Sequence, residues 1–174
     1  MAVQKERTIT VVPSDVATIS NIEVTDTSNN NSISFDAIGE GDYEFALNDP
    51  NGPYQDEPFF DNLPPDLYTL YTRDKNGCGI SEKEISVIGF PRFFTPNGDG
   101  VNDFWQIKGI SDRNQVEGNV SVFDRYGKLL VIINPGGPGW NGHYNGTLLP
   151  ANDYWFKVTL ADGRTFTSHF ALRR

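Results

Sequence analysis

The segment Phe90–Asp103, FPRFFTPNGDGVND, constrains the fold more than any other part of the chain. It contains two prolines, two glycines and four Asn or Asp residues. Pro91 and Pro96 lack a backbone N–H, and Gly98 and Gly100 favour positive φ. No regular helix or strand can therefore run through this segment. The sequence predicts an ordered loop here, followed directly by a strand.

The composition of the whole chain favours strands over helices. Of the 174 residues, 37% are hydrophobic and 13% are aromatic, enough to form real cores. The apolar residues are largely Val, Ile, Phe, Tyr and Trp, which prefer strands, and 17 Gly and 11 Pro supply turns. No segment has a convincing apolar period of 3.6 residues. We predict an all-β fold of two consecutive β-sandwich, immunoglobulin-like domains.

Two similar segments suggest where the domains end. KERTITVVP (Lys5–Pro13) and KEISVIGFP (Lys83–Pro91) each have a charged pair, an alternating apolar run and a proline. We interpret each as the last strand of a domain followed by a linker. The predicted parts are a tail strand of an upstream repeat or a linker at 1–13, an immunoglobulin-like β-sandwich repeat at 14–89 and a second β-sandwich at 90–174.

Alternating apolar residues and turn formers predict the individual strands. In the first sandwich they are expected at Ala17–Asp26, Ser32–Gly39, Tyr43–Asn48, Leu67–Asp74 and Glu82–Gly89. In the second they are expected at Phe90–Phe94, Phe104–Lys108, Val120–Asp124, Lys128–Ile133, Tyr154–Leu160 and Thr165–Leu172. A break is expected near Asn21, and hairpin turns at Arg125–Gly127 and Asp162–Gly163.

Charge is distributed unevenly along the chain, whose net charge is −9. Residues 1–89 carry 5 Lys and Arg against 16 Asp and Glu, whereas residues 90–174 carry 9 against 7. The acidic half argues against nucleic-acid binding, because phosphate contacts need cations. No apolar run reaches the roughly 18 residues of a membrane helix. The polar start MAVQKERT is no signal peptide, so we expect a C-terminal fragment with Met1 supplied for expression.

The sequence offers no catalytic constellation. His143 and His169 are its only histidines, and it contains no HExxH, GxSxG or GxxxxGK[ST] motif. Ser168 and His169 are neighbours on a predicted strand, so they point to opposite faces. Cys78, the only cysteine, excludes an intrachain disulfide and is expected to be a buried small hydrophobe. We predict that the chain is not an enzyme.

The loop Thr95–Asp103 is a candidate metal site, because Ca²⁺ prefers several hard oxygens on a tightly curved backbone. Aligned with an EF-hand loop, its candidate calcium ligands are Asn97, Asp99, the Val101 carbonyl and Asp103. Thr95 at the first position lacks a carboxylate, and Gln106 at the last is an amide. The alternative is a metal-free turn in which Asn and Asp side chains cap backbone amides. We favour this alternative slightly and predict that no cofactor is required.

The aromatic residues of the second half allow two interpretations. The set consists of Trp105, Trp140, Tyr144, Tyr154 and Trp155. They either form a sugar-stacking platform or fill the core, which is the commoner fate of Trp in a small sandwich. Trp140 lies in a Gly/Pro loop and is expected to be partly exposed.

Four blocks of the second half resemble a known family. They read FTPNGDGVNDFW, VFDRYGKLL, GWNGHYNGTLLPANDYWF and DGRTFTSHFALRR, in that order up to the last residue. Together they resemble the C-terminal sorting domain of type IX-secreted proteins, in the subtype called type B or gliding-motility-associated. In the first half, YTRDKNGCG resembles more weakly the repeats that precede such domains on large surface adhesins.

The resemblance implies a secretion and surface-targeting signal. Its partners would be the outer-membrane components of the type IX machinery and an associated outer-membrane protein, and nucleic acid would not be among them. The protein would cross the outer membrane to the cell surface or the extracellular space, as a monomer. A carbohydrate- or surface-binding adhesin module and a passive spacer are the alternatives.

A folded signal needs a surface that distinguishes it from other sandwiches. We predict that this surface comprises the loops Thr95–Asp103 and Gly136–Asn145 and the last residues of the chain. The candidate recognition residues are Thr95, Pro96, Asn97, Gly98, Asp99, Gly100, Asn102, Asp103, Trp140, Arg173 and Arg174. Phe170 and Leu172 are either part of this surface or part of the core.

Overall fold

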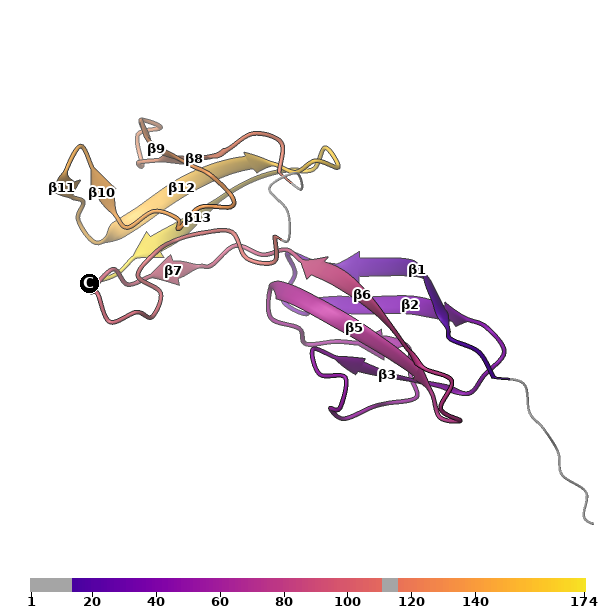
Figure 1. Cartoon of the computed structure of the whole chain (residues 1–174). Coiled ribbons are helices and arrows are strands. Elements are labelled where there is room, and N and C mark those ends of the chain that lie inside the picture. Colours follow the sequence, from indigo (N-terminus) through magenta and orange to yellow (C-terminus); the bar gives the residue numbers. More distant parts are fainter. Residues whose placement is uncertain (1–13, 111–115) are drawn as a thin grey trace, which may run out of the picture. The chain divides into compact units, whose positions relative to one another are not determined.

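The computed structural model describes residues 14–110 and 116–174, so the strand predicted within residues 1–13 lies outside it. Every regular element of the described chain is a strand (Figure 1). The predicted all-β fold of β-sandwiches is confirmed. The described chain also contains no helix long and apolar enough to cross a membrane.

The first six strands form two three-stranded sheets, β1-β2-β4 and β3-β5-β6. They are β1 (Thr18–Thr25), β2 (Ser32–Ile38), β3 (Tyr43–Leu47), β4 (Phe59–Phe60), β5 (Asp66–Asp74) and β6 (Ile80–Val87). Phe35 of β2 meets Phe45 of β3 edge to face, with ring centroids 4.9 Å apart, so side chains of the two sheets share a core. The break predicted in β1 is confirmed at Asn21, whose φ is 47°.

The remaining strands form a five-stranded sheet in the order β7-β13-β12-β8-β9, beside a short β10-β11 hairpin (Figure 1). They are β7 (Phe93–Phe94), β8 (Val120–Phe123), β9 (Leu129–Ile133), β10 (His143–Tyr144), β11 (Thr147–Leu148), β12 (Asn152–Thr159) and β13 (Thr165–Leu172). The terminal strand β13 pairs antiparallel with β12 along its whole length and parallel with β7. It therefore lies inside the sheet, not at its edge.

Both predicted hairpin turns of this sheet are confirmed. In the first, Asp124 Oδ1 accepts hydrogen bonds from the Tyr126 and Lys128 amides, both at 2.9 Å, and Gly127 takes a φ of 79°. In the second, between β12 and β13, Gly163 takes a φ of 87°. Side-chain capping and positive φ thus close both turns, as the turn chemistry of the sequence indicates.

The predicted strand at Phe104–Lys108 is wrong. Only isolated bridges occur there, joining Trp105 to Trp140 and Lys108 to Gly89. The side-chain amide of the intervening Gln106 donates hydrogen bonds to the carbonyls of Asn134 and Gly137, at 2.9 and 3.0 Å. This segment is therefore fixed by scattered contacts to different partners, not by one continuous neighbouring strand.

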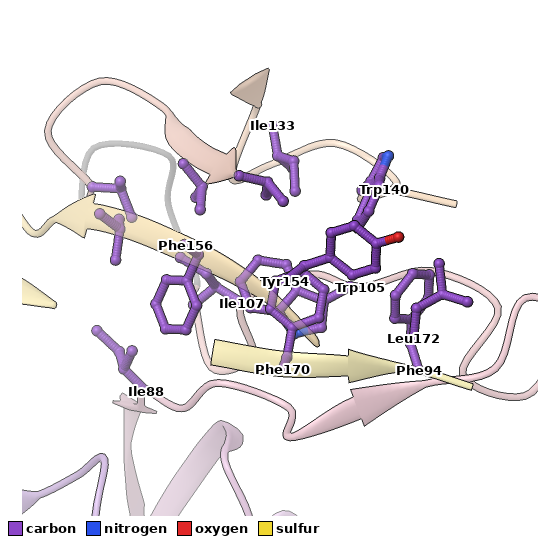
Figure 2. Packing of buried hydrophobic residues seen from close by; sticks show 14 of the residues in the cluster. Ile88, Phe94, Trp105, Ile107, Ile133, Trp140, Tyr154, Phe156, Phe170 and Leu172 are labelled. Carbon is purple, nitrogen blue, oxygen red and sulfur yellow. The ribbon is translucent and has the colours of Figure 1, made fainter. Parts of the chain in front are cut away.

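One face of the five-stranded sheet carries a core rich in aromatic residues (Figure 2). Trp105 is fully buried and stacks on Phe170 of β13, with centroids 4.0 Å apart and planes at 12°. Its indole N–H donates to the Pro91 carbonyl at 2.8 Å, so the polar atom is satisfied. Phe94 and Leu172 close the end of this core and are also buried.

Contacts divide the chain into two compact units. The first takes in the described residues up to Glu23, with Ser34–Phe59 and Thr69–Glu84. The second takes in Val24–Ile33, Phe60–Tyr68 and Ile85–Arg174. All the aromatic core described above thus belongs to the second unit. The boundary predicted between residues 89 and 90 stays a prediction.

Candidate recognition surface

The loop Thr95–Asp103 is closed by its own backbone and side chains. The Thr95 amide donates to the Asn102 carbonyl at 2.8 Å, which brings the two ends of the loop together. Gly98 and Gly100 take φ values of 80° and 85°, as their positions predicted. The loop is therefore ordered by local hydrogen bonds, although it contains no regular structure.

Asp103 organises this loop through its carboxylate. Oδ1 accepts the amides of Asn97 and Gly98 at 3.0 and 2.6 Å, and Oδ2 accepts the amide of Gly100 at 2.7 Å. These N–H groups, with those of Gly98 and Gly100 contributing most, hold the pKa of the Asp103 carboxyl below its ordinary value. The charged form of Asp103 is thus the one that the loop stabilises.

Asp99 and Asn97 cap the tip of the same loop. Asp99 Oδ1 accepts the Val101 amide at 2.7 Å, and Asp99 Oδ2 accepts the Asn97 side-chain amide at 2.8 Å. Asn97 Oδ1 in turn accepts the Asp99 amide at 3.1 Å. The side-chain oxygens that the calcium prediction requires therefore accept N–H groups of the loop, and the Val101 carbonyl accepts the Thr95 hydroxyl at 3.3 Å.

Gln106, the last position of the aligned calcium loop, points elsewhere. Its Oε1 accepts the Ile107 amide, and its amide group donates to two distant carbonyls. Within residues 14–110 and 116–174, no three His, Cys, Asp or Glu side chains cluster as metal ligands would. The observed contacts are those of a turn in which Asn and Asp side chains cap backbone amides.

The prediction that Trp140 is partly exposed is wrong, because only 3% of it is exposed. Its ring meets Tyr154 edge to face at 5.1 Å, and its indole N–H donates to the His143 carbonyl at 2.8 Å. Trp105 and Tyr154 are buried as well. Three of the five aromatics proposed as a sugar platform therefore lie in the core. Trp140 therefore belongs to the core and not to the exposed recognition surface that the sequence predicted.

The last five residues of the chain divide between core and surface. Phe170 and Leu172 are 0% and 2% exposed, so the core interpretation of these two is confirmed. Arg173 and Arg174 are both exposed, but their guanidinium groups have different neighbours. The alternation of the sequence predicts that Phe170 and Leu172 are buried, since alternate residues of β13 face the core.

The guanidinium of Arg173 lies over an aromatic ring, whereas that of Arg174 donates a hydrogen bond to a backbone carbonyl. The Arg173 guanidinium carbon lies 4.5 Å from the ring centroid of Phe93, which is 39% exposed. Arg174 Nη1 donates to the Leu149 carbonyl. Sequence reasoning missed Phe93 as the partner of Arg173, because nothing local indicates that β7 pairs with β13.

Three other side chains bear on catalysis. Ser168 and His169 occupy adjacent positions of β13 and are both exposed. The expectation that Cys78 is buried is wrong: it is exposed, and its sulfur contacts the Ser14 carbonyl at 3.1 Å. The Ser14 hydroxyl in turn donates a hydrogen bond to the Asp74 carboxylate.

The regular elements of the second half of the chain are all strands, and its ordered loop and terminal arginines lie on its surface. Its residues 88–171 match the family described as CHU_C type IX secretion signal domain. This region of the chain is therefore a type IX secretion signal domain, as the four sequence blocks predicted. The chain carries a secretion signal that leads across the outer membrane to the cell surface.

Two solved structures show more distant likeness. One, described as a biofilm associated protein BSP domain, is 15% identical over 88% of this chain and 29% of its own, with a TM-score of 0.31. The other, a Bacteroides ovatus mixed-linkage glucan utilization locus SGBP-B in complex with mixed-linkage heptasaccharide, is 11% identical over 92% of this chain and 42% of its own, with a TM-score of 0.25. The chain spans less than half of either structure. No curated protein matches it.

Proposed function

We propose that the type IX machinery reads residues 88–174 as a folded surface and not as a short linear tag. The observation that supports this is the position of β13, which pairs with both β12 and β7 and fills the core with Phe170 and Leu172. Only folding of the domain gives the remaining side chains of this segment a fixed arrangement next to those of β7 and β12. An associated outer-membrane protein then holds the exported protein at the cell surface.

We place the recognised groups on the loop Thr95–Asp103 and on Arg173. The loop is rigid without regular structure, and Arg173 lies exposed against Phe93. A guanidinium on an aromatic face keeps its donors available for a carboxylate or carbonyl of a partner. Arg174 has a supporting role, because its hydrogen bond to the Leu149 carbonyl fixes the end of the chain.

We propose further that the loop works without a metal ion. Asp99 and Asp103 already direct their oxygens at four amides of the loop. Calcium is the alternative, with ligands from Asn97, Asp99, Val101 and Asp103. The two proposals differ in how stability responds to calcium.

We propose that residues 14–89 are a repeat of a large adhesin-like surface protein of the gliding-motility type. Its support is the YTRDKNGCG segment and the net negative charge of residues 1–89. In this proposal the repeat is cargo and spacer, and export does not depend on its sequence.

A reporter fusion tests the proposed function. A periplasm-directed reporter carrying residues 88–174 is expected to reach the medium or cell surface in a host with the type IX system, and to stay inside when the translocon is disrupted. A reporter carrying only residues 165–174 is expected to stay inside in both hosts. Export of the short fusion would contradict recognition of a folded surface.

A further inference from the structure

The edge strand β9 is unusually apolar. It is the last strand of the five-stranded sheet, and no other strand in the described part of the chain pairs with its outer side. Its sequence is LLVII, and Leu129 and Ile132 are 44% and 56% exposed. Edge strands usually carry charges or are covered, because their unpaired N–H and C=O groups recruit other strands. An aliphatic edge strand that no other strand covers is therefore a candidate binding site for another chain.

A hollow of about 230 Å³ lies at the beginning of this strand. Its lining includes Tyr126, Leu130, Tyr144, Leu149 and Pro150. The pairing register of β8 and β9 shifts next to Leu130, and such a bulge redirects a side chain. Leu130 thus belongs both to the edge strand and to the hollow. This space suits one or two side chains and is smaller than the roughly 300 Å³ of common small-molecule pockets.

The rim of the hollow carries two cations that lack an acidic partner. Lys128 Nζ lies 4.7 Å from the Tyr144 ring centroid, and the Arg125 guanidinium lies 5.8 Å from that of Tyr126. Among the described residues, neither forms an ion pair with a carboxylate. The nearby Asp124 directs its Oδ1 at two backbone amides of the turn. Asp153 also lines the hollow, so its rim combines two carboxylates with Arg125, Lys128 and the adjoining Arg174. The hollow therefore offers an aromatic and aliphatic wall below a rim on which cations outnumber carboxylates by one.

We infer that β9 and this hollow bind an extended acidic peptide segment of a protein partner. The segment adds to the sheet as a strand along β9 and places an apolar side chain in the hollow. A neighbouring Asp or Glu of the segment pairs with Arg125 and Lys128. This inference rests on the proposed recognition of a folded surface, and it names the chemistry of one partner that reads that surface.

Backbone geometry favours a peptide over an anionic sugar. A strand edge gains affinity from main-chain hydrogen bonds, which only another peptide supplies in the matching spacing, and alternate side chains give specificity. At one end of the β9 edge, the hollow supplies one site that can hold a side chain of the bound peptide. The Leu149 carbonyl at its rim also binds Arg174, so the hollow adjoins the end of the chain.

The direct test uses the full 174-residue chain and an array of short synthetic peptides. The peptides alternate Val or Tyr with Thr and carry one Glu at varied positions. One matched control set replaces Glu with Gln, and another places Pro at alternate positions to remove backbone donors. At least one Glu peptide is expected to bind and to protect the β9 amides from hydrogen exchange. Its Gln counterpart should bind about tenfold more weakly, and its Pro counterpart should not bind.

Variants locate the binding. The Arg125→Gln and Lys128→Gln double variant is expected to reduce the preference for Glu over Gln to nearly one. Ile132→Lys should abolish binding, whereas Ile38→Lys changes an equally exposed isoleucine (58%) of the first sandwich and should have no effect. Both lysine variants are compared by melting temperature to show that they fold.

Several outcomes would overturn this inference. They are the absence of any peptide that protects β9, protection that maps to another strand, and binding of polygalacturonate that protects β9 where no peptide does. None of these outcomes would contradict the proposed function, which is tested separately by export of the reporter fused to residues 88–174. Export of that reporter without peptide binding to β9 would remove the edge-strand inference alone.

Discussion

The two halves of the chain build their cores differently. The first sandwich buries polar groups among its apolar residues, namely Asn31, Thr72 and Asp74. The described part of residues 88–174 has no fully buried polar or charged residue, and its core centres on tryptophan and phenylalanine rings. Its central ring, Phe170, comes from the last strand of the chain. The domain that carries the signal thus completes its core only with its final residues, which links recognition to a finished fold.

Replacing one buried phenylalanine in each half by alanine tests this contrast. Of all the variants, Phe170→Ala is expected to change stability and export most. Phe170→Ala removes the ring that stacks on Trp105 and should lower the free energy of unfolding by about 3–5 kcal/mol. Export of a reporter fused to the full chain should be lost. Urea unfolding and the amount of reporter outside the cell are the measurements.

Phe35→Ala is the matched control, because Phe35 is also buried (4% exposed) and packs on Phe45. It should cost a similar free energy in the first sandwich but leave export intact. Equal loss of export in both variants would mean that the machinery requires the whole chain to be folded and not the terminal domain specifically.

Asp103→Asn is expected to have the next largest effect. The amide keeps one acceptor oxygen but loses the second, so the loop amides of Asn97, Gly98 and Gly100 can no longer all be satisfied. We expect the melting temperature at pH 7 to fall by a few degrees. The matched control is Asp153→Asn, another carboxylate of the same domain at the start of β12.

The same variant predicts a change in pH dependence. The pKa of Asp103 is lowered in the folded protein, so its contribution is complete above its ordinary value of 3.8 and is lost as pH falls through the lowered folded value. The wild-type protein should therefore lose more stability than Asp103→Asn below about pH 4. Parallel stability curves for the two proteins between pH 6 and 3 would contradict the assigned role of Asp103.

Most strands and turns were predictable because they depend on local chemistry. The alternation in β13 and the Asp and Gly residues of both hairpin turns directly indicate what the structure contains. The order of the loop Thr95–Asp103 and its capping side chains were also predictable. The family assignment of residues 88–171 followed from four ordered blocks, which depend on sequence and not on tertiary contacts.

Non-local contacts account for the errors. Trp140 lies in a Gly/Pro loop, which locally indicates exposure, but the Trp105 backbone bridge folds that loop over the core. Phe104–Lys108 alternates like a strand, yet its backbone finds only two isolated partners. Likewise, Arg173 and Arg174 are indistinguishable in sequence, and only the pairing of β7 with β13 separates their surroundings.

That difference between the two terminal arginines leads to a smaller expected effect. Arg174→Gln removes the hydrogen bond to the Leu149 carbonyl and should lower the free energy of unfolding by about 1 kcal/mol or less. Its effect on export should follow this loss of stability. Arg173→Gln removes a charge from the Phe93 ring and should reduce export several-fold with the melting temperature nearly unchanged. If Arg174→Gln were the variant with normal stability and impaired export, the two roles would be reversed.

Calcium is expected to have the smallest effect of all. In the capped loop the Asp99 and Asp103 carboxylates accept amide N–H groups, and Gln106 is bound to other carbonyls. Millimolar CaCl₂ and excess chelator should therefore give the same melting temperature, since only a ligand that binds the folded state raises it. The comparison needs Asp99→Ala in both buffers, because nonspecific effects of calcium on an acidic protein would persist in that variant. A rise in melting temperature with calcium that Asp99→Ala removes would replace the metal-free turn with a calcium site at this loop.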